Sequence, residues 1–145
     1  MLDRAATALI KPVINRLAQV FVRVGLTANQ MTLIGFMIGL VAAILIASHA
    51  YLAGAAAILL SRLGDALDGA MARQRQPTDA GGFLDIALDF LFYAAIPLAF
   101  AVAQPQTNAL AAAVLLAAFI GTGSSFLAFA VMATKRGMTS LDYPS

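Results

Sequence analysis

Residues 24–61 read VGLTANQMTLIGFMIGLVAAILIASHAYLAGAAAILLS and contain no Lys, Arg, Asp or Glu. A second uncharged run covers residues 90–134. Because a helix needs about 20 residues to cross the hydrocarbon core of a membrane, each run is long enough for about two crossings. Polar or turn-forming residues interrupt the runs near their centres, at 48–51 and at 104–108. The pattern predicts two helical hairpins, with spans at about 30–47, 51–73, 83–103 and 108–133.

The composition supports a membrane protein. The chain has 145 residues, of which 61% are hydrophobic and 11% are charged, whereas soluble domains are about half apolar and about a quarter charged. It has no Cys and one His, which excludes disulfides, thiol nucleophiles and Cys- or His-based zinc sites. The net charge is +2, but the basic residues do not form a stripe on a solvent-exposed surface, so we expect no nucleic-acid partner. We predict one all-α integral membrane domain over residues 1–145.

The basic residues predict the orientation of the chain. Lys and Arg accumulate in the cytoplasmic flanks of membrane spans, and none lies in the two central interruptions. With four spans, the flanking basic residues fall on one face, so both termini, including a tail at 134–145, are expected in the cytoplasm. These flanking residues are Arg4, Lys11, Arg16, Arg23, Arg73, Arg75, Lys135 and Arg136. Arg62 is the exception, because it lies inside the second predicted span.

The pattern of apolar residues in 1–24 predicts an amphipathic helix. Apolar residues recur at spacings of three and four, from Leu2 to Val24, and basic residues lie on the other face. Such a helix is suited to lying in the membrane interface; a soluble helix packed on a partner is the alternative. Pro12 is expected to bend or split it.

Four Asp residues lie inside the second and third predicted spans, where charged groups are costly. Asp65 and Asp68 are three residues apart, so they share a helix face. Asp85 and Asp89, four apart, share another. The short loop at 74–81 should bring the two helices close together and antiparallel, so that all four carboxylates converge near the cytoplasmic side. Oxygen ligands suit Mg²⁺ or Mn²⁺, and two such ions would balance four negative charges. A proton or ion pathway, or an assembly role, would also use such a cluster.

The spacing of these residues carries a family resemblance. The pattern Asp65-x-x-Asp68-Gly69-x-x-Ala72-Arg73, then eight residues, then Gly82-x-x-x-Asp85-x-x-x-Asp89 resembles the signature of the CDP-alcohol phosphotransferase (CDP-alcohol phosphatidyltransferase) family, class I. Members are membrane enzymes of phospholipid synthesis. They transfer a phosphatidyl group from CDP-diacylglycerol to an alcohol, or a phospho-alcohol from its CDP ester to a lipid, and release CMP.

The resemblance implies the same reaction here, in the cell's inner (cytoplasmic) membrane, with CDP-diacylglycerol as the expected donor. The acceptor stays open among glycerol 3-phosphate, an inositol phosphate, serine and other alcohols. Two Mg²⁺ or Mn²⁺ ions are implied, with Asp65 and Asp85 touching both. Asp68 and Asp89 would each touch one ion, and Asp89 would also act as the general base.

The resemblance further implies a site for the CDP group. Gly69 and Arg73 would contact the pyrophosphate, since a guanidinium can hold a phosphate in a bidentate manner. Ala72 and Gly82 are small motif residues that leave room for a ligand or a close helix.

Further contacts with the nucleotide are implied outside the central motif. Many members carry Thr-Pro-Asn-x-x-Thr before the first span, and residues 27–32 read TANQMT, with Ala28 in place of Pro. Asn29 and Thr32 would then contact the cytidine. A weaker nucleotide contact is carried over to Asp79, where some relatives have a small hydroxyl residue.

The number of spans differs from the usual family pattern. Members usually have six spans, whereas four are predicted here over residues 30–133. We therefore expect the tail at 134–145 to lead to further spans that complete the cavity, the alternative being an unusually short member of the family. In either case we expect the 145 residues alone to turn over poorly. The small residues Gly121–Ser125 in the fourth span suit close helix packing, either within the chain or in a homodimer.

Overall fold

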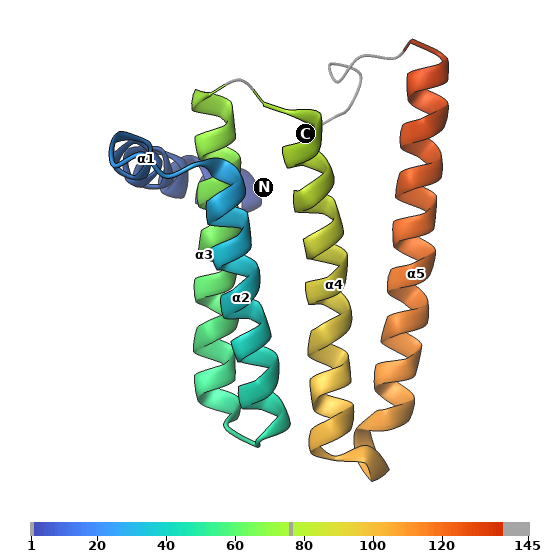
Figure 1. Cartoon of the computed structure of the whole chain (residues 1–145). Coiled ribbons are helices and arrows are strands. Elements are labelled where there is room, and N and C mark those ends of the chain that lie inside the picture. The colour runs from blue at the N-terminus through green and yellow to red at the C-terminus, as the bar shows by residue number, and fades with distance from the viewer. Residues whose placement is uncertain (1, 76, 138–145) are drawn as a thin grey trace.

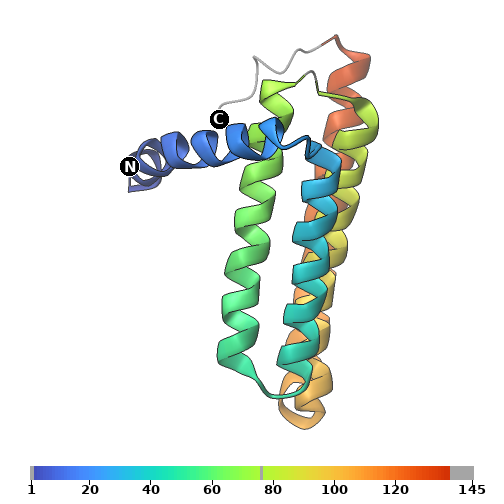
Figure 2. The same cartoon turned by 60° about the vertical axis from the view of Figure 1, so that its left-hand side comes forward.

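The computed structural model describes residues 2–75 and 77–137, and this part of the chain folds into five helices. The four helices α2 to α5 run up and down as a bundle, and α1 lies across one end of it (Figures 1 and 2). The bounds are α1 Leu2–Arg23, α2 Ala28–Ala47, α3 Tyr51–Gln74, α4 Asp79–Ala103 and α5 Pro105–Lys135. The last four helices correspond, in order and place, to the four predicted spans.

Three of these helices, α2, α4 and α5, are long and apolar enough to cross a membrane. The 24-residue helix α3 lies beside α2 over the same height of the bundle (Figure 1). Composition alone does not mark α3 as a span, because it carries four charged residues from its midpoint onward, namely Arg62, Asp65, Asp68 and Arg73.

Local sequence explains where the helices begin. Thr27 and Gln30 form a capping box at the start of α2, in which the Thr27 hydroxyl accepts from the Gln30 amide at 3.2 Å. Thr78 caps α4 and accepts from the amide of Gly81 at 3.1 Å. This cap explains why α4 begins at Asp79, earlier than the expected residue 83.

Helices α3 and α4 meet through their side chains, whereas their backbones are bridged by α2. The two helices run antiparallel (Figure 1) and bring Asp65, Asp68 and Asp85 together, as expected, but within the described residues their backbones do not come into direct contact. Instead α2 packs against both. Its glycines explain this, because Gly35 faces Gly64 of α3, and Gly39 leaves room for the ring of Phe92 on α4.

Helix α1 is anchored on the end of α3. It is a single helix that runs through Pro12, so of the two expected effects of this proline, a bend or a split, the split does not occur. Ile14 and Ala18 are buried in a core cluster with residues of α2 and α3, namely Met31, Leu67, Ala70 and Met71. Among the side chains of α1 whose burial the structure describes, Phe21 and Val22 pack partly against this cluster, whereas Ile10, Val13, Leu17 and Val20 are exposed.

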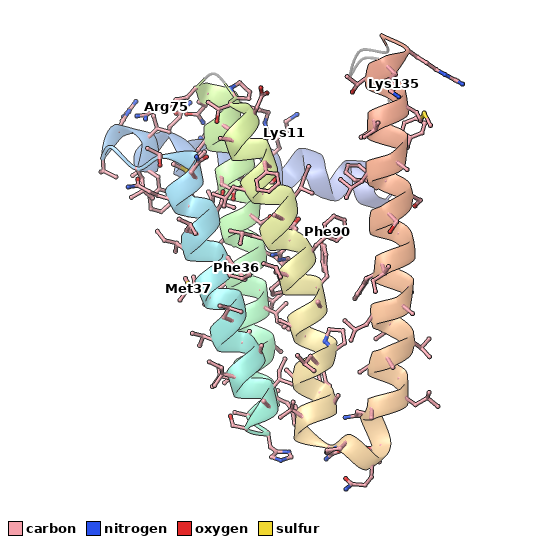
Figure 3. All side chains as sticks on the ribbon, turned by 45° about the vertical axis from the view of Figure 1, so that its right-hand side comes forward. Lys11, Phe36, Met37, Arg75, Phe90 and Lys135 are labelled. Atoms are coloured by element: carbon pink, nitrogen blue, oxygen red, sulfur yellow. The ribbon has the colours of Figure 1, made fainter. Side chains whose placement is uncertain are left out.

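Helix α5 packs only against α4 among the described helices. The two helices approach closely at Gly123, where an added Cβ would lie 2.6 Å from the Phe90 ring, and Figure 3 shows Phe90 reaching from α4 toward α5. The run Gly121–Ser125 therefore packs within the chain at Gly123. Figure 3 also places Lys11, Arg75 and Lys135 at the same end of the bundle. Of the expected tail, residues 138–145 lie outside the described residues.

Candidate active site

Three carboxylates from two helices converge at the end of the bundle where α1 lies. Asp65 and Asp68 of α3 and Asp85 of α4 each offer an oxygen atom, and these three atoms lie within 4.8 Å of one another. Asp68 is 5% exposed, whereas Asp65 and Asp85 are half-buried. We call these three residues the carboxylate cluster.

One oxygen of the cluster is left without a partner. Oδ2 of Asp68 is buried and has no hydrogen-bond partner within the part of the chain that the structure describes. An unpaired buried carboxylate oxygen is unfavourable. Because hard divalent cations take carboxylate oxygens as ligands, the cluster fits such an ion.

Asp89 points to a different partner. Its Oδ1 lies 2.9 Å from a guanidinium nitrogen of Arg62, and the same nitrogen lies 3.7 Å from Oδ2 of Asp65. Asp89 lines the same narrow polar cavity as the three cluster residues. Its carboxylate, however, is bonded to Arg62 and does not belong to the group of three.

A larger cavity of about 320 Å³ adjoins the carboxylates. Thr32, Asp68 and Asp85 line both cavities, so the larger one opens directly on the carboxylate cluster. Three residues expected to contact CDP line this larger cavity, namely Asn29, Thr32 and Gly69, and so do the small motif residues Ala72 and Gly82. The sequence segments 27–32, 68–72 and 81–85 thus meet in space.

Two expected nucleotide contacts lie outside the lining of that cavity. Arg73 is exposed, and one of its guanidinium nitrogens would lie 3.4 Å from a Cβ added to Gly69. This places the guanidinium beside the cavity wall. Asp79 is exposed in the first turn of α4 and does not line the cavity.

Sequence reasoning missed several residues of the site. Arg75 and Thr78 line the larger cavity, and Arg75 also donates a 3.4 Å hydrogen bond to the carbonyl oxygen of Val22. Phe92, buried one turn after Asp89, lies under the guanidinium of Arg62. The signal for the last pair was the charge of Arg62 within an apolar helix, which demands a partner at the same depth.

The fold and the site define a class: a multi-pass helical membrane protein in which carboxylates from two long helices face a cavity at one end of the bundle. Residues 25–141 match the sequence profile described as CDP-alcohol phosphatidyltransferase. The chain belongs to this family of membrane enzymes of phospholipid synthesis, which confirms the resemblance seen in the sequence.

Named relatives agree with this assignment. The chain is 53% identical to the inner membrane protein YnjF of Escherichia coli over 143 residues, which is 99% of this chain and 69% of YnjF. It is 43% and 34% identical to archaetidylinositol phosphate synthases of Methanothermobacter thermautotrophicus and Pyrococcus horikoshii. These matches cover 56% and 60% of this chain, but only 43% and 47% of the two synthases. No solved structure matches the chain significantly.

Proposed function

We propose that this protein transfers a phosphatidyl group from CDP-diacylglycerol to the hydroxyl of an alcohol and releases CMP. The observation that carries the proposal is the carboxylate cluster, which opens on a cavity lined by the remaining motif residues. In this reaction, the acceptor oxygen forms a bond to the phosphorus that bears the diacylglycerol. The pyrophosphate P–O bond to CMP breaks, and the hydroxyl proton passes to a base.

The chain's own residues divide this work between them. Asn29 and Thr32 line the cavity at the start of α2 and would contact the cytidine. Gly69 and the neighbouring guanidinium of Arg73 would contact the pyrophosphate, where a positive charge offsets the phosphate charge. Asp89 would accept the proton from the acceptor hydroxyl as general base.

Asp65, Asp68 and Asp85 would hold a divalent cation, Mg²⁺ or Mn²⁺, and Asp89 would help to hold a second. The fit is supported by the convergence of the three oxygens and by the unpaired oxygen of Asp68. Bound divalent ions supply Lewis-acid stabilisation of the charge that develops on transferring phosphoryl oxygens.

We also propose a topology for the bundle. Helix α3 would also cross the membrane, in addition to α2, α4 and α5, with its charged residues facing the site. Its 24 residues correspond to about 36 Å of helix, enough for one crossing. The basic residues at one end of the bundle (Figure 3) favour a cytoplasmic site. Helix α1, with its exposed apolar side chains, would lie in the membrane interface. The membrane would be the inner membrane, as in the name of YnjF.

The acceptor is best sought among phosphorylated alcohols. The two synthases matched over about half of this chain are named for archaetidylinositol phosphate, so an inositol phosphate is the first acceptor to test. Glycerol 3-phosphate, serine and other alcohols complete the panel.

The test is CMP release by the purified natural full-length protein in lipid nanodiscs, supplied with CDP-diacylglycerol, Mg²⁺ or Mn²⁺ and one alcohol at a time. We expect CMP release that requires both an alcohol and a divalent ion, and that is lost in Asp85→Asn. CMP release that is the same without any alcohol would contradict transfer. A protein that neither binds CDP nor releases CMP with any member of the panel would leave the ion-pathway hypothesis as the better explanation of the cluster.

A further inference from the structure

Arg62 places a fixed positive charge among the intramembrane carboxylates. Its guanidinium lies 2.9 Å from Asp89 of α4 and 3.7 Å from Asp65 of its own helix. Its Nε is buried without a hydrogen-bond partner in the described part of the chain. Arg62 is not one of the residues of the family signature quoted above, so the family assignment does not explain it.

The position of this guanidinium is built into the packing. The Cζ atom of Arg62 lies 4.1 Å from the centre of the Phe92 ring, a distance typical of a cation–π contact. Phe92 is 5% exposed. Its ring fits because residue 39 is glycine: a Cβ there would lie 2.5 Å from the ring. Arg62 is thus held between Asp89 and Phe92, which lie one helical turn apart on α4.

The guanidinium also spans a gap between helices. The backbones of α3 and α4 do not contact each other within the described residues, so the ion pair from Arg62 to Asp89 is a direct side-chain link between them. It keeps the Asp89 carboxylate on Arg62, in the narrow cavity that Asp89 shares with the carboxylate cluster.

The charges around the cavity follow from this arrangement. Four carboxylates and one guanidinium have a net charge of −3. Two divalent ions carry a charge of +4, which is more than is needed to neutralise it. With Asp89 neutralised by Arg62, three carboxylates remain for a first ion. A second ion that uses Asp89 has to compete with Arg62 for the same carboxylate, against the repulsion of a like charge.

We propose that Arg62 is a positioning residue that keeps the Asp89 carboxylate in an ion pair while the first divalent ion binds. The two divalent ions therefore bind in two steps of unequal affinity. The first ion is taken by Asp65, Asp68 and Asp85 while Asp89 stays on Arg62. The second ion binds only as the Asp89 carboxylate leaves Arg62. This inference rests on the proposed metal-dependent function and adds an order of binding to it.

The test is Mn²⁺ binding to the purified full-length protein, followed by the electron paramagnetic resonance signal of free Mn²⁺, which needs no turnover. For the unaltered protein we expect two binding steps, with the second ion held at least about tenfold more weakly than the first. In Arg62→Gln, the second step should tighten more than the first, so that the ratio of the two affinities falls about tenfold. Arg62→Lys, which keeps the charge, should retain the unequal steps.

Two controls separate this effect from others. Arg136→Gln removes an exposed positive charge at the end of α5 and should leave both steps unchanged. Asp89→Asn should remove the second step and keep the first, which gives an independent reading if Arg62→Gln does not fold.

The outcomes are distinguishable. An unchanged affinity ratio in folded Arg62→Gln overturns the role of Arg62 while leaving the metal site intact. Two Mn²⁺-binding steps of equal affinity in the unaltered protein would also overturn the role of Arg62. A second Mn²⁺-binding step that persists in Asp89→Asn would overturn it too. A protein that binds no Mn²⁺ overturns both the inference and the metal-dependent function.

Discussion

The hydroxyl of Ser61 donates a 2.8 Å hydrogen bond to the backbone carbonyl oxygen of Gly35, and both residues are buried where α3 meets α2. A helical carbonyl can accept this second bond only if the two helices come very close. The bond therefore fixes the rotation and depth of α3 one turn before Asp65. It explains how the charged half of α3 is held toward the cavity.

The same contact predicts a stability defect in Gly64→Ala. A Cβ at residue 64 would lie 3.0 Å from the Cα of Gly35, and neither backbone can move aside as a flexible side chain could. Overpacking of this kind costs about 1–3 kcal/mol, so we expect a lower melting temperature in detergent. Gly121→Ala is the control, because nothing lies within 4 Å of its new methyl group. Equal melting temperatures for the two variants would show that α2 and α3 can separate without loss.

A second glycine tests the nucleotide site without disturbing the fold. A methyl group at residue 69 would meet only the guanidinium of Arg73, at an ordinary contact distance of 3.4 Å. Gly69→Ala should therefore melt like the parent. If the pyrophosphate of CDP lies against this glycine, the methyl group overlaps it, and CDP affinity should fall about tenfold or more. Equilibrium binding of CDP with Mn²⁺ present measures this, and an unchanged affinity would place the pyrophosphate elsewhere.

The fold could be predicted from the sequence because hydrocarbon imposes a simple length rule. The predicted spans at 30–47 and 51–73 differ from α2 and α3 by no more than two residues at either end. The start of α4 was missed because Thr78 caps a helix that begins before its apolar residues. The loop length correctly indicated that side chains of α3 and α4 would meet, but it could not show that the glycines of α2 bring the backbone of α2 against both helices.

The site could be predicted as a set of residues but not as a network. Helical spacing placed Asp65 and Asp68 on one face, and the structure brings Asp85 to them. The partner of Asp89 depends on how far the Arg62 side chain reaches across a gap, and on the ring of Phe92 beneath it. These are tertiary relationships that no spacing rule contains.

The different surroundings of Asp85 and Asp89 predict different losses. Asp85 contributes one of the three clustered oxygens, so Asp85→Asn should abolish tight Mn²⁺ binding and turnover together. Asp89→Asn leaves the cluster whole and should keep the first Mn²⁺, while CMP release by the full-length protein falls about 10²–10⁴-fold, as expected for loss of a general base. Mn²⁺ binding and CMP release measured on the same preparations check both statements. Loss of the first Mn²⁺ in Asp89→Asn would make Asp89 a ligand of that ion.

The effect of CDP or CMP on the melting temperature distinguishes a transferase from an ion pathway or an assembly protein, and it tests whether Arg73 binds the nucleotide. A ligand that binds only the folded state stabilises it and so raises the melting temperature. At a ligand concentration of 100 times the dissociation constant, the free energy of unfolding rises by about 2.7 kcal/mol. We expect CDP or CMP to stabilise the protein only when Mg²⁺ or Mn²⁺ is present, because the anionic nucleotide and the carboxylates would otherwise repel each other.

Arg73 is exposed beside Gly69, so Arg73→Ala should leave the unliganded melting temperature unchanged and remove most of the shift caused by CDP. Arg16→Ala, which removes an exposed guanidinium from α1, should keep the full shift. An ion pathway or an assembly protein would show no effect of CDP in either variant or in the parent, and that result in the full-length protein would reject the transferase.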